Sequence, residues 1–351
     1  MSQGDGSDGP DAGRPVETAV DAVLAEDDSR DRESVRAALE TVAEDGVVSD
    51  ASIESALGEL AKVVSTPETR VEFAAMELSE AKETAEAEGV ADLDTVRARV
   101  EAYESRLESV EEEIGELGPR LRAVVDRRNE GANTYEVATA VHELETEAND
   151  LHYTADELQV ELEEFGRWLA DPGTRHDEFE AELEAVEASL GGLTGTVEDL
   201  TAAEGERDAA GEDAAGDDEG DGTGEDATTP DLPADPSVVW ADARLRTRVT
   251  GLLLADLRAE LADLRAWPDG AESGGDRGRL GKLKDRLGEL EERRRTLSDR
   301  LDDLSRPAWT ERFGDRLDEF EAAMDGFEPP VSWGEVEAEL ERYRDGIEPT
   351  D

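Results

Sequence analysis

The most regular hydrophobic pattern in the chain is LDTVRARVEAYESRLESVEEEIGELGPRLRAV (93–124), and the expected fold is built on it. Its apolar residues recur at alternating steps of three and four, which is the heptad seam of a coiled-coil helix. The seam consists of Leu93, Val96, Val100, Tyr103, Leu107, Val110, Ile114, Leu117, Leu121 and Val124. Pro119 lies inside the repeat and removes one helical hydrogen bond. Because the heptad phase continues past it, we expect a kink there rather than a break.

A second seam follows after a short polar segment. Its members are Val137, Val141, Leu144, Ala148, Leu151, Ala155, Leu158, Leu162, Phe165 and Leu169. We interpret the intervening VDRRNEGANTYEVA (125–138) as a plain helix–helix turn, in which Gly131 relieves the backbone and Asn133 or Thr134 caps the next helix. Short loops make consecutive helices antiparallel. We therefore expect an antiparallel hairpin, with Tyr103 and the alanines of the second seam as size-matched packing between its arms.

The chain before and after this hairpin also has helical periodicity. A third seam runs from Phe179 to Leu200, and a fourth runs from Leu280 to Leu304. Near the N-terminus, short amphipathic helices precede VVSTPE (63–68), where we expect one helix to end and another to begin with Thr66 as N-cap and Pro67 at its first position. The fold class predicted is all-α.

These patterns predict five regions. They are a disordered tail (1–14), a small helical unit (15–66), an antiparallel coiled-coil bundle (67–200), a disordered acidic linker (201–236) and a separate C-terminal helical domain (237–351). The linker prediction depends on its Gly, Asp and Ala content and its lack of periodicity. Four of the five tryptophans fall in the last region, which indicates a core of its own.

The chain is strongly acidic. It has 36 basic and 94 acidic residues, a formal net charge of −58, and four lysines against 32 arginines. Such a charge destabilises a compact state through self-repulsion. At salt near 1 M the Debye length is only about 3 Å, so the repulsion is largely screened. Because the hydrophobic patterning argues against disorder, we expect folding in concentrated salt, as in salt-in haloarchaea.

Several classes of protein are excluded or disfavoured. The sequence has no cysteine, which excludes disulfides, thiolate chemistry and Cys–zinc sites. The N-terminal residues lack the charge pattern of a signal peptide. The longest strongly apolar run is Leu252–Leu254, far below the roughly 20 residues of a membrane span. We therefore expect a cytoplasmic protein with no membrane span.

The sequence offers little to catalysis. Its histidines, His142, His152 and His176, form no HExxH pattern, and no GxSxG, phosphate-binding or dinucleotide-binding motif occurs. The acidic piece at 217–228 resembles a calcium loop, but Thr228 stands where a bidentate glutamate is required. We expect neither enzymatic activity nor a cofactor or metal.

Two segments deserve comparison with nucleic-acid binders. The 31–64 segment has the outline of a helix-turn-helix, yet its second helix carries one lysine against three acids, which repel phosphates. The locally basic helix at 277–300 contains Arg293, Arg294 and Arg295, which form the candidate interaction surface. Most of its arginines are expected to pair with acidic helices. Arg294 itself lies in the leucine seam, where we expect it to lower stability and to set register or partner choice.

Three segments carry a resemblance to a known family: VVSTPETRVEFAAMELSEA (63–81), YEVA (135–138) and ADELQVELEEFGRWLADP (155–172). With these the chain resembles the haloarchaeal cytoplasmic coiled-coil family labelled "halo transducer protein", over about residues 16–200. The resemblance implies kinship with chemotaxis and phototaxis transducers, and it supplies no site residues.

The function expected is a non-enzymatic interaction or scaffold protein of a halophilic cytoplasm, associated with signal transduction. Its partners are expected to be proteins, either another protein or a second copy of this chain. The alternative is a nucleic-acid-associated regulator that uses the N-terminal helical unit or the arginine-rich helix at 277–300.

Overall fold

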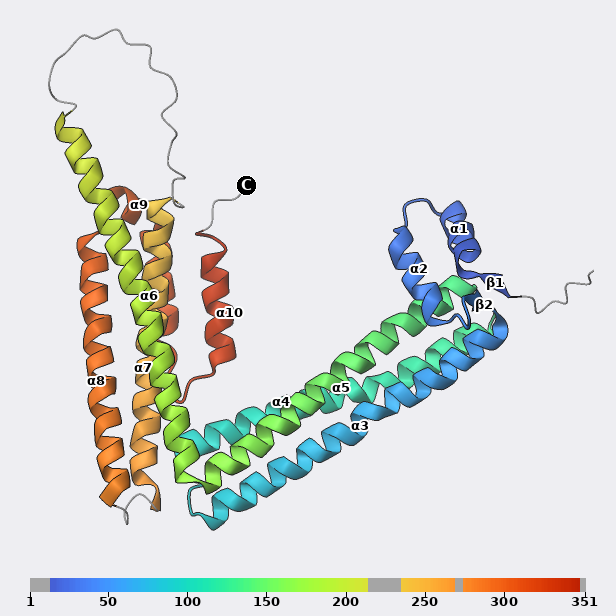
Figure 1. Ribbon diagram of the computed structural model, residues 1–351, viewed down its shortest axis with the longest axis horizontal. Helices are drawn as coiled ribbons and strands as arrows, with labels where there is room; N and C mark the ends of the chain where they lie inside the picture. Colours follow the sequence, from blue (N-terminus) through green and yellow to red (C-terminus); the bar gives the residue numbers. More distant parts are fainter. Residues whose placement is uncertain (1–12, 214–234, 269–273, 348–351) are drawn as a thin grey trace, which may run out of the picture. The chain divides into compact units, whose positions relative to one another are not determined.

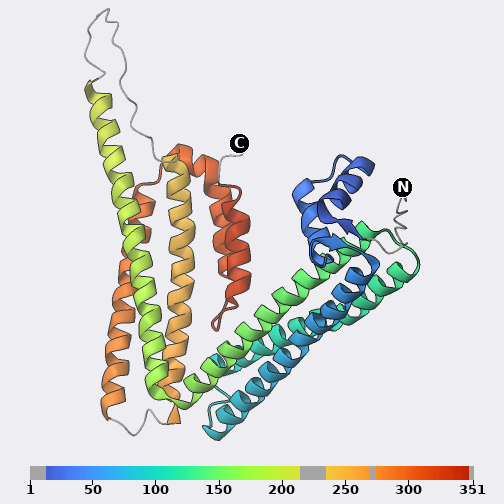
Figure 2. The same ribbon diagram turned by 45° about the vertical axis from the view of Figure 1, so that its right-hand side comes forward.

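The computed structural model describes residues 13–213, 235–268 and 274–347, and it is helical almost throughout (Figures 1 and 2). These residues form ten α-helices and one short antiparallel strand pair, which confirms the all-α class. In chain order the elements are β1 (Arg14–Pro15), α1 (Val16–Glu26), α2 (Arg32–Thr41), β2 (Val47–Val48), α3 (Asp50–Ala87), α4 (Asp94–Asn129), α5 (Thr134–Ala170), α6 (Pro172–Asp213), α7 (Pro236–Ala266), α8 (Gly274–Asp303), α9 (Pro307–Met324) and α10 (Trp333–Arg344).

The chain divides into two compact units. Unit 1 comprises Met1–Glu88 and Arg99–Ala170, and unit 2 comprises Gly89–Ala98 and Asp171–Asp351. This division differs from the predicted regions, because the third seam (α6) packs with α7 and α8 rather than with α4 and α5. The 15–66 segment is also not separate, since its apolar residues share one core with α3, α4 and α5.

Helix α3 continues through the point where a break was expected. It runs 38 residues from Asp50 to Ala87 with Pro67 inside it. Just ahead of the proline, the hydroxyls of Ser65 and Thr66 both donate to the carbonyl of Lys62 at 2.9 Å. Thr66 therefore bonds within the helix instead of capping a new one. The prediction of two helices meeting at 66–67 is wrong, and burial of Pro67 in the bundle supplies the compensating contact.

The turn at 125–138 has the geometry expected of a plain helical connection. Gly131 has φ of +91°, a conformation that a residue without Cβ adopts at little cost. The Oδ1 of Asn133 accepts from the backbone N–H of Glu136 at 2.9 Å, and its Nδ2 donates to the Glu136 carboxylate at 2.9 Å. Asn133 thus caps α5. The continuous helix α4, which includes Pro119, agrees with the predicted absence of a break.

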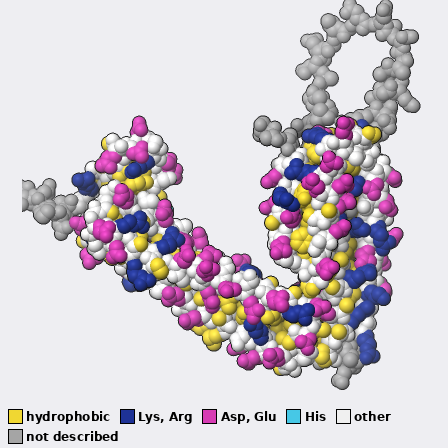
Figure 3. Space-filling view, turned by 180° about the vertical axis from the view of Figure 1, so that it is seen from behind, with side chains coloured by type: hydrophobic (Ala, Val, Ile, Leu, Met, Phe, Trp, Pro, Cys, Tyr) yellow, Lys and Arg dark blue, Asp and Glu magenta, His cyan; other side chains and the backbone are white. Residues whose placement is uncertain are grey.

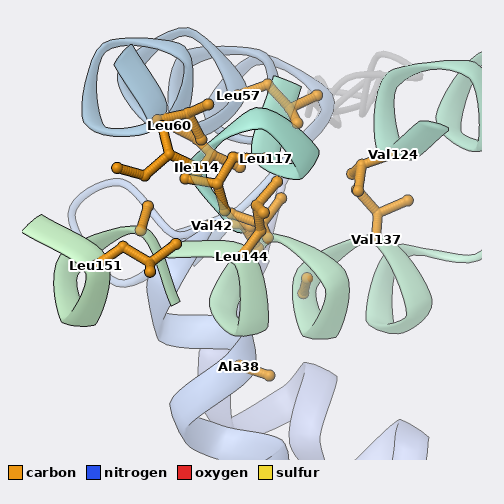
Figure 4. Close-up of a cluster of buried hydrophobic side chains, with 14 of the residues drawn as sticks. Ala38, Val42, Leu57, Leu60, Ile114, Leu117, Val124, Val137, Leu144 and Leu151 are labelled. Atoms are coloured by element: carbon orange, nitrogen blue, oxygen red, sulfur yellow. The ribbon is translucent and has the colours of Figure 1, made fainter. Parts of the chain in front are cut away.

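The core of unit 1 lies between α3, α4 and α5. Figure 4 shows leucines of α3 and α5 meeting Ile114 and Leu117 of α4, with Val124 and Val137 facing each other beside the turn. Helices α4 and α5 are antiparallel, as Arg106–Glu161 and Arg120–Glu147 ion pairs show. The first seam therefore builds the hairpin that its periodicity predicts.

The closest pair of helices in this core is α3 and α5, which run parallel with Cα atoms within 8 Å of each other. Their register is marked by the ion pair between Arg70 Nε and Asp156 Oδ1 at 3.0 Å. Small side chains permit this approach, because Ala74, Ala148 and Ala155 are completely buried. The small buried residues of α5, Ala148 and Ala155, thus belong to a core to which α3 also contributes. Tyr103 joins the antiparallel arms as predicted, with its ring 5.4 Å from that of Phe165.

Unit 2 is built on α6, α7 and α8. Arginines of α8 pair with acids of α6 in ascending order along both helices, so α6 and α8 are parallel and α7 runs opposite to them (Figure 1). Helices α9 and α10 pack on α7. The indole of Trp240 donates to the Leu301 carbonyl at 2.8 Å and lies 5.7 Å from the Trp309 ring.

Part of the segment predicted as a linker, 201–236, is helical. Helix α6 continues to Asp213, so residues 201–213 are helical, and α7 begins at Pro236. The remaining part, 214–234, lies outside the described residues, as does most of the predicted tail at 1–14. Gly and Ala without apolar periodicity were read as disorder, but they can extend a helix that packing has already started.

Candidate interaction surfaces

The groups that catalysis or metal binding would use are dispersed. Within the described ranges, no group of three or more His, Asp or Glu side chains is placed to hold a metal ion. His142 Nδ1 lies 2.9 Å from the Thr41 hydroxyl, His152 Nε2 lies 3.5 Å from Asp156, and His176 is buried. The calcium-like piece at 217–228 falls outside the described residues. None of the described helices has the length and apolar character needed to cross a membrane.

A ladder of ion pairs joins α8 to α6. Arg279 pairs with Asp177 and with Glu180 (3.0 Å), and Arg286 pairs with Glu187 at 2.8 Å, one heptad further on. The hydrogen bond from Arg286, together with its charge, holds the pKa of the Glu187 carboxyl below its usual range. In Figure 3 basic side chains gather along the edge of unit 2 that α8 forms. The ladder shows that several of them neutralise acids of the same unit.

The predicted surface of Arg293, Arg294 and Arg295 does not form one basic face. Arg293 turns toward α6, with Nη1 3.5 Å from Glu187, and Arg295 pairs with Glu292 of its own helix. Arg294 turns toward α7. Successive residues of a helix point about 100° apart. The three guanidinium groups therefore meet three different surroundings.

Arg294 is half-buried in a groove between α7 and α8. The groove has a volume of about 300 Å³ and is lined by Gly251, Leu254, Ala255, Arg258, Glu291, Arg294 and Arg295. Burial, followed by repulsion from Arg248 and Arg295, lowers the pKa of the Arg294 guanidinium. In the described parts of the chain Arg294 makes no ion pair and no hydrogen bond.

The N-terminal basic residues also have acidic partners. Arg36 Nε donates to Glu17 at 2.7 Å, and Arg32 pairs with Asp21 at 2.7 Å. These contacts join α2 to α1, and they raise the pKa of both guanidinium groups. The would-be recognition helix of the 31–64 segment is the first part of the 38-residue helix α3. Its apolar face lies in the core of unit 1, so this segment does not have the form of a free helix-turn-helix.

Unit 1 exposes apolar side chains on α3 and α5 that the heptad seams do not account for. We call them the α3/α5 patch: Phe73, Met76, Tyr153 and Val160, exposed by 44%, 57%, 70% and 52%. The Arg70–Asp156 ion pair places Phe73 and Val160 at the same level, because each lies one helical turn further along its own helix. One more turn along lie Glu77 and Glu163. Phe73 and Val160 therefore lie at one level of the α3/α5 pair, and Met76 and Tyr153 are exposed on the same two helices.

Acidic groups flank this patch. The pKa of the Glu77 carboxyl is raised, first by partial burial and then by the negative charges of Glu80 and Glu163. The charged form of Glu77 is thus less favourable here than in water. An approaching cation would offset the repulsion from Glu80 and Glu163 and stabilise the charged carboxylate. The patch combines apolar contact area with an uncompensated negative rim.

The heptad pattern does not predict the α3/α5 patch, because it separates seam residues, expected in the core, from all others, expected at the surface. A signal was present, since Phe73, Met76, Tyr153 and Val160 are large apolar residues that lie off the seams of their helices. Single exposed apolar residues are common. Only the parallel pairing of α3 with α5 brings the exposed apolar residues of the two helices near each other.

Comparison with known proteins identifies no relative: neither the family models, nor the curated proteins, nor the solved structures contain a match to this chain.

Proposed function

We propose that this chain is a non-enzymatic helical scaffold that binds a partner protein through the α3/α5 patch. The observation that carries the proposal is the exposure of four large apolar side chains on two adjacent helices of unit 1, α3 and α5. Grouped exposed apolar residues are characteristic of interaction sites, and large aromatic side chains dominate interface energetics.

The partner that fits is an amphipathic helix with basic residues beside its apolar face. Tyr153 and Val160 are seven residues apart, a span of about 10 Å on a helix, which matches two to three turns of a docked helix. A basic flank on that helix would pair with Glu77 and Glu163. A second copy of this chain would instead bring a surface rich in acids, because acidic residues outnumber basic ones by 94 to 36.

The cellular setting we propose is a halophilic archaeal cytoplasm. The net charge of −58 and the scarcity of lysine support folding in concentrated salt. The resemblance to the "halo transducer protein" family supports a role connected with signal transduction. Binding through apolar contacts suits this setting, since high salt weakens surface ion pairs and leaves hydrophobic burial in place.

The alternative, a regulator that binds nucleic acid, has less support. Arg32 and Arg36 of α2 and Arg279 and Arg286 of α8 all pair with acids of their own unit. Phosphate binding would have to displace these internal partners.

The experiment is site-specific photo-cross-linking in the native host at its own salt concentration. A photo-reactive amino acid replaces Phe73, and the cross-linked peptides are identified by mass spectrometry. We expect one protein other than this chain, cross-linked through a segment with basic residues and helical apolar spacing. Val160→Glu should abolish that product, because it places a charge in the contact.

The matched control is Ala123→Glu, which adds the same charge to an exposed position of α4 in the same unit. It should leave the product unchanged. Recovery of this chain alone would show self-association and refute the proposed partner. A product that survives Val160→Glu would show that the patch is not the binding surface.

A further inference from the structure

Arg294 occupies a position where α8 otherwise carries leucine. Its seam neighbours Leu290 and Leu297 are buried, with exposed fractions of 2% and 4%. Across from Arg294, helix α7 has Gly251 in its interior. A Cβ on Gly251 would lie 3.3 Å from Cδ, 3.4 Å from Nη1 and 3.6 Å from Cζ of Arg294. The glycine therefore leaves the space in which the guanidinium lies, although glycine weakens a helix.

The acids closest to Arg294 along α8 are engaged elsewhere. Glu291 pairs with Arg258 of α7, and Glu292 pairs with Arg295. Across the described ranges, the guanidinium of Arg294 has neither an ion-pair partner nor a hydrogen bond. This is unusual in a chain with 94 acidic residues and 36 basic ones. The arrangement keeps a partly desolvated cation without an anion in direct contact, although Glu291 lines the same groove.

The surroundings of Arg294 favour an added negative charge. Arg248 and Arg295 are the like charges that, after burial, lower its pKa, and only the weaker effects of Asp299 and Glu291 oppose them. Because a neighbouring anion stabilises the charged form of a guanidinium, binding of an anion would offset the cost of burying Arg294.

The groove beside Arg294 has the size and lining for a small ligand. Its volume of about 300 Å³ exceeds that of a phosphate group, and Leu254 and Ala255 of α7 form its apolar side. Apolar walls exclude water and strengthen a charge-assisted hydrogen bond. The planar guanidinium presents paired N–H donors that match two oxygens of a tetrahedral oxyanion, which chloride cannot reproduce.

We propose that Arg294 is an oxyanion-binding residue that holds a phosphate group in the groove between α7 and α8. The phosphate is either free or the end of a small ester. Arg248 and Arg295 contribute by their positive field, and Gly251 contributes by leaving space for the guanidinium.

The test is isothermal titration calorimetry of the full chain in molar KCl, with inorganic phosphate and glycerol phosphate as separate probes. The chloride background removes non-specific ionic effects. We expect saturable binding of at least one probe, and Arg294→Gln should weaken it by about tenfold or more, since it removes the charge-assisted hydrogen bonds. Tighter binding of glycerol phosphate would identify the ester as the source.

Two further variants separate binding from folding. Gly251→Ala keeps the charge and improves helix propensity, yet its methyl group competes for the guanidinium's space, so it should also weaken binding. Arg342→Gln removes an exposed arginine of α10 that pairs with Glu339, and it should bind like the original chain. Equal binding by all four proteins, or no binding of either probe, would overturn the proposal.

Discussion

Replacing Ala155 with leucine tests whether α3 and α5 pack as closely as the structure has them. Ala155 is completely buried and precedes Asp156, whose ion pair with Arg70 marks the level of α3 that it faces. Ala74 lies one turn further along α3 and is also completely buried. A leucine here would add three carbon atoms where two backbones approach each other.

A seam with room for leucine and a closely packed α3/α5 pair predict opposite changes in the stability of unit 1. In an ordinary heptad seam with room for leucine, the added carbons would stabilise unit 1 by about 2 kcal/mol, at roughly 0.8 kcal/mol per buried CH₂. In the close α3/α5 pair they overpack the core, which costs about 1–3 kcal/mol. For a unit of roughly 150–250 residues each kcal/mol corresponds to about 2–4 °C. We therefore expect the melting temperature of unit 1 to fall by several degrees in Ala155→Leu.

The assay is differential scanning calorimetry of the full chain in molar KCl. The control is Ala123→Leu, the same exchange at an exposed position of α4, which should shift the transition by about 0.5 kcal/mol or less. An Ala155→Leu transition that is unchanged or higher than that of the original chain would refute the close packing of α3 and α5.

Three other predictions concern local features of the fold. Gly191→Ala and Gly192→Ala should each stabilise α6 by up to about 1 kcal/mol, because an added Cβ meets no atom within 4 Å; the midpoint of guanidinium unfolding checks this. The pKa of Asp171 is lowered mainly by hydrogen bonds from Thr174 and the backbone N–H of Gly173. The ionised Asp171 therefore stabilises the folded state at neutral pH. This stabilisation is lost as the pH falls below the ordinary pKa of 3.8 and through the lowered pKa of the folded state. Asp171→Asn should reduce this acid-induced loss of stability, and a melting-temperature profile from pH 6 to pH 2 unchanged by the substitution would contradict it. On dialysis from molar KCl to dilute buffer, the helical signal at 222 nm should fall as repulsion among the acids is unscreened, whereas undiminished helicity would refute the role assigned to salt.

The local structure of the hairpin follows from its sequence. The seams before and after 125–138 form α4 and α5, Gly131 has the positive φ expected of a helix-ending glycine, and Asn133 caps α5. These features depend on residues close together in the chain. Steric limits and hydrogen bonds to the next turn are enough to determine them.

One helix boundary and one domain boundary could not be predicted from neighbouring residues. Pro67 has the local appearance of a helix start, but its neighbours Ser65 and Thr66 satisfy helical carbonyls and the core of unit 1 holds the helix together. The third seam has the same periodicity as the first two, yet it joins unit 2. A seam indicates that a helix buries one face, but it does not indicate which helix covers that face. The choice of partner helix depends on the summed packing of whole surfaces.

The helical character of the chain, the positions of most helices and the form of the 125–138 turn follow from residues close together in the chain. The close pairing of α3 with α5, which brings Phe73 and Val160 to one level, follows only from the folded arrangement. The same holds for the contact of Arg294 with Gly251 while Glu291 and Glu292 pair with other arginines. The physical reason is that the environment of an exposed apolar or charged side chain is set by residues distant in sequence. Their proximity follows from how the helices share their buried faces.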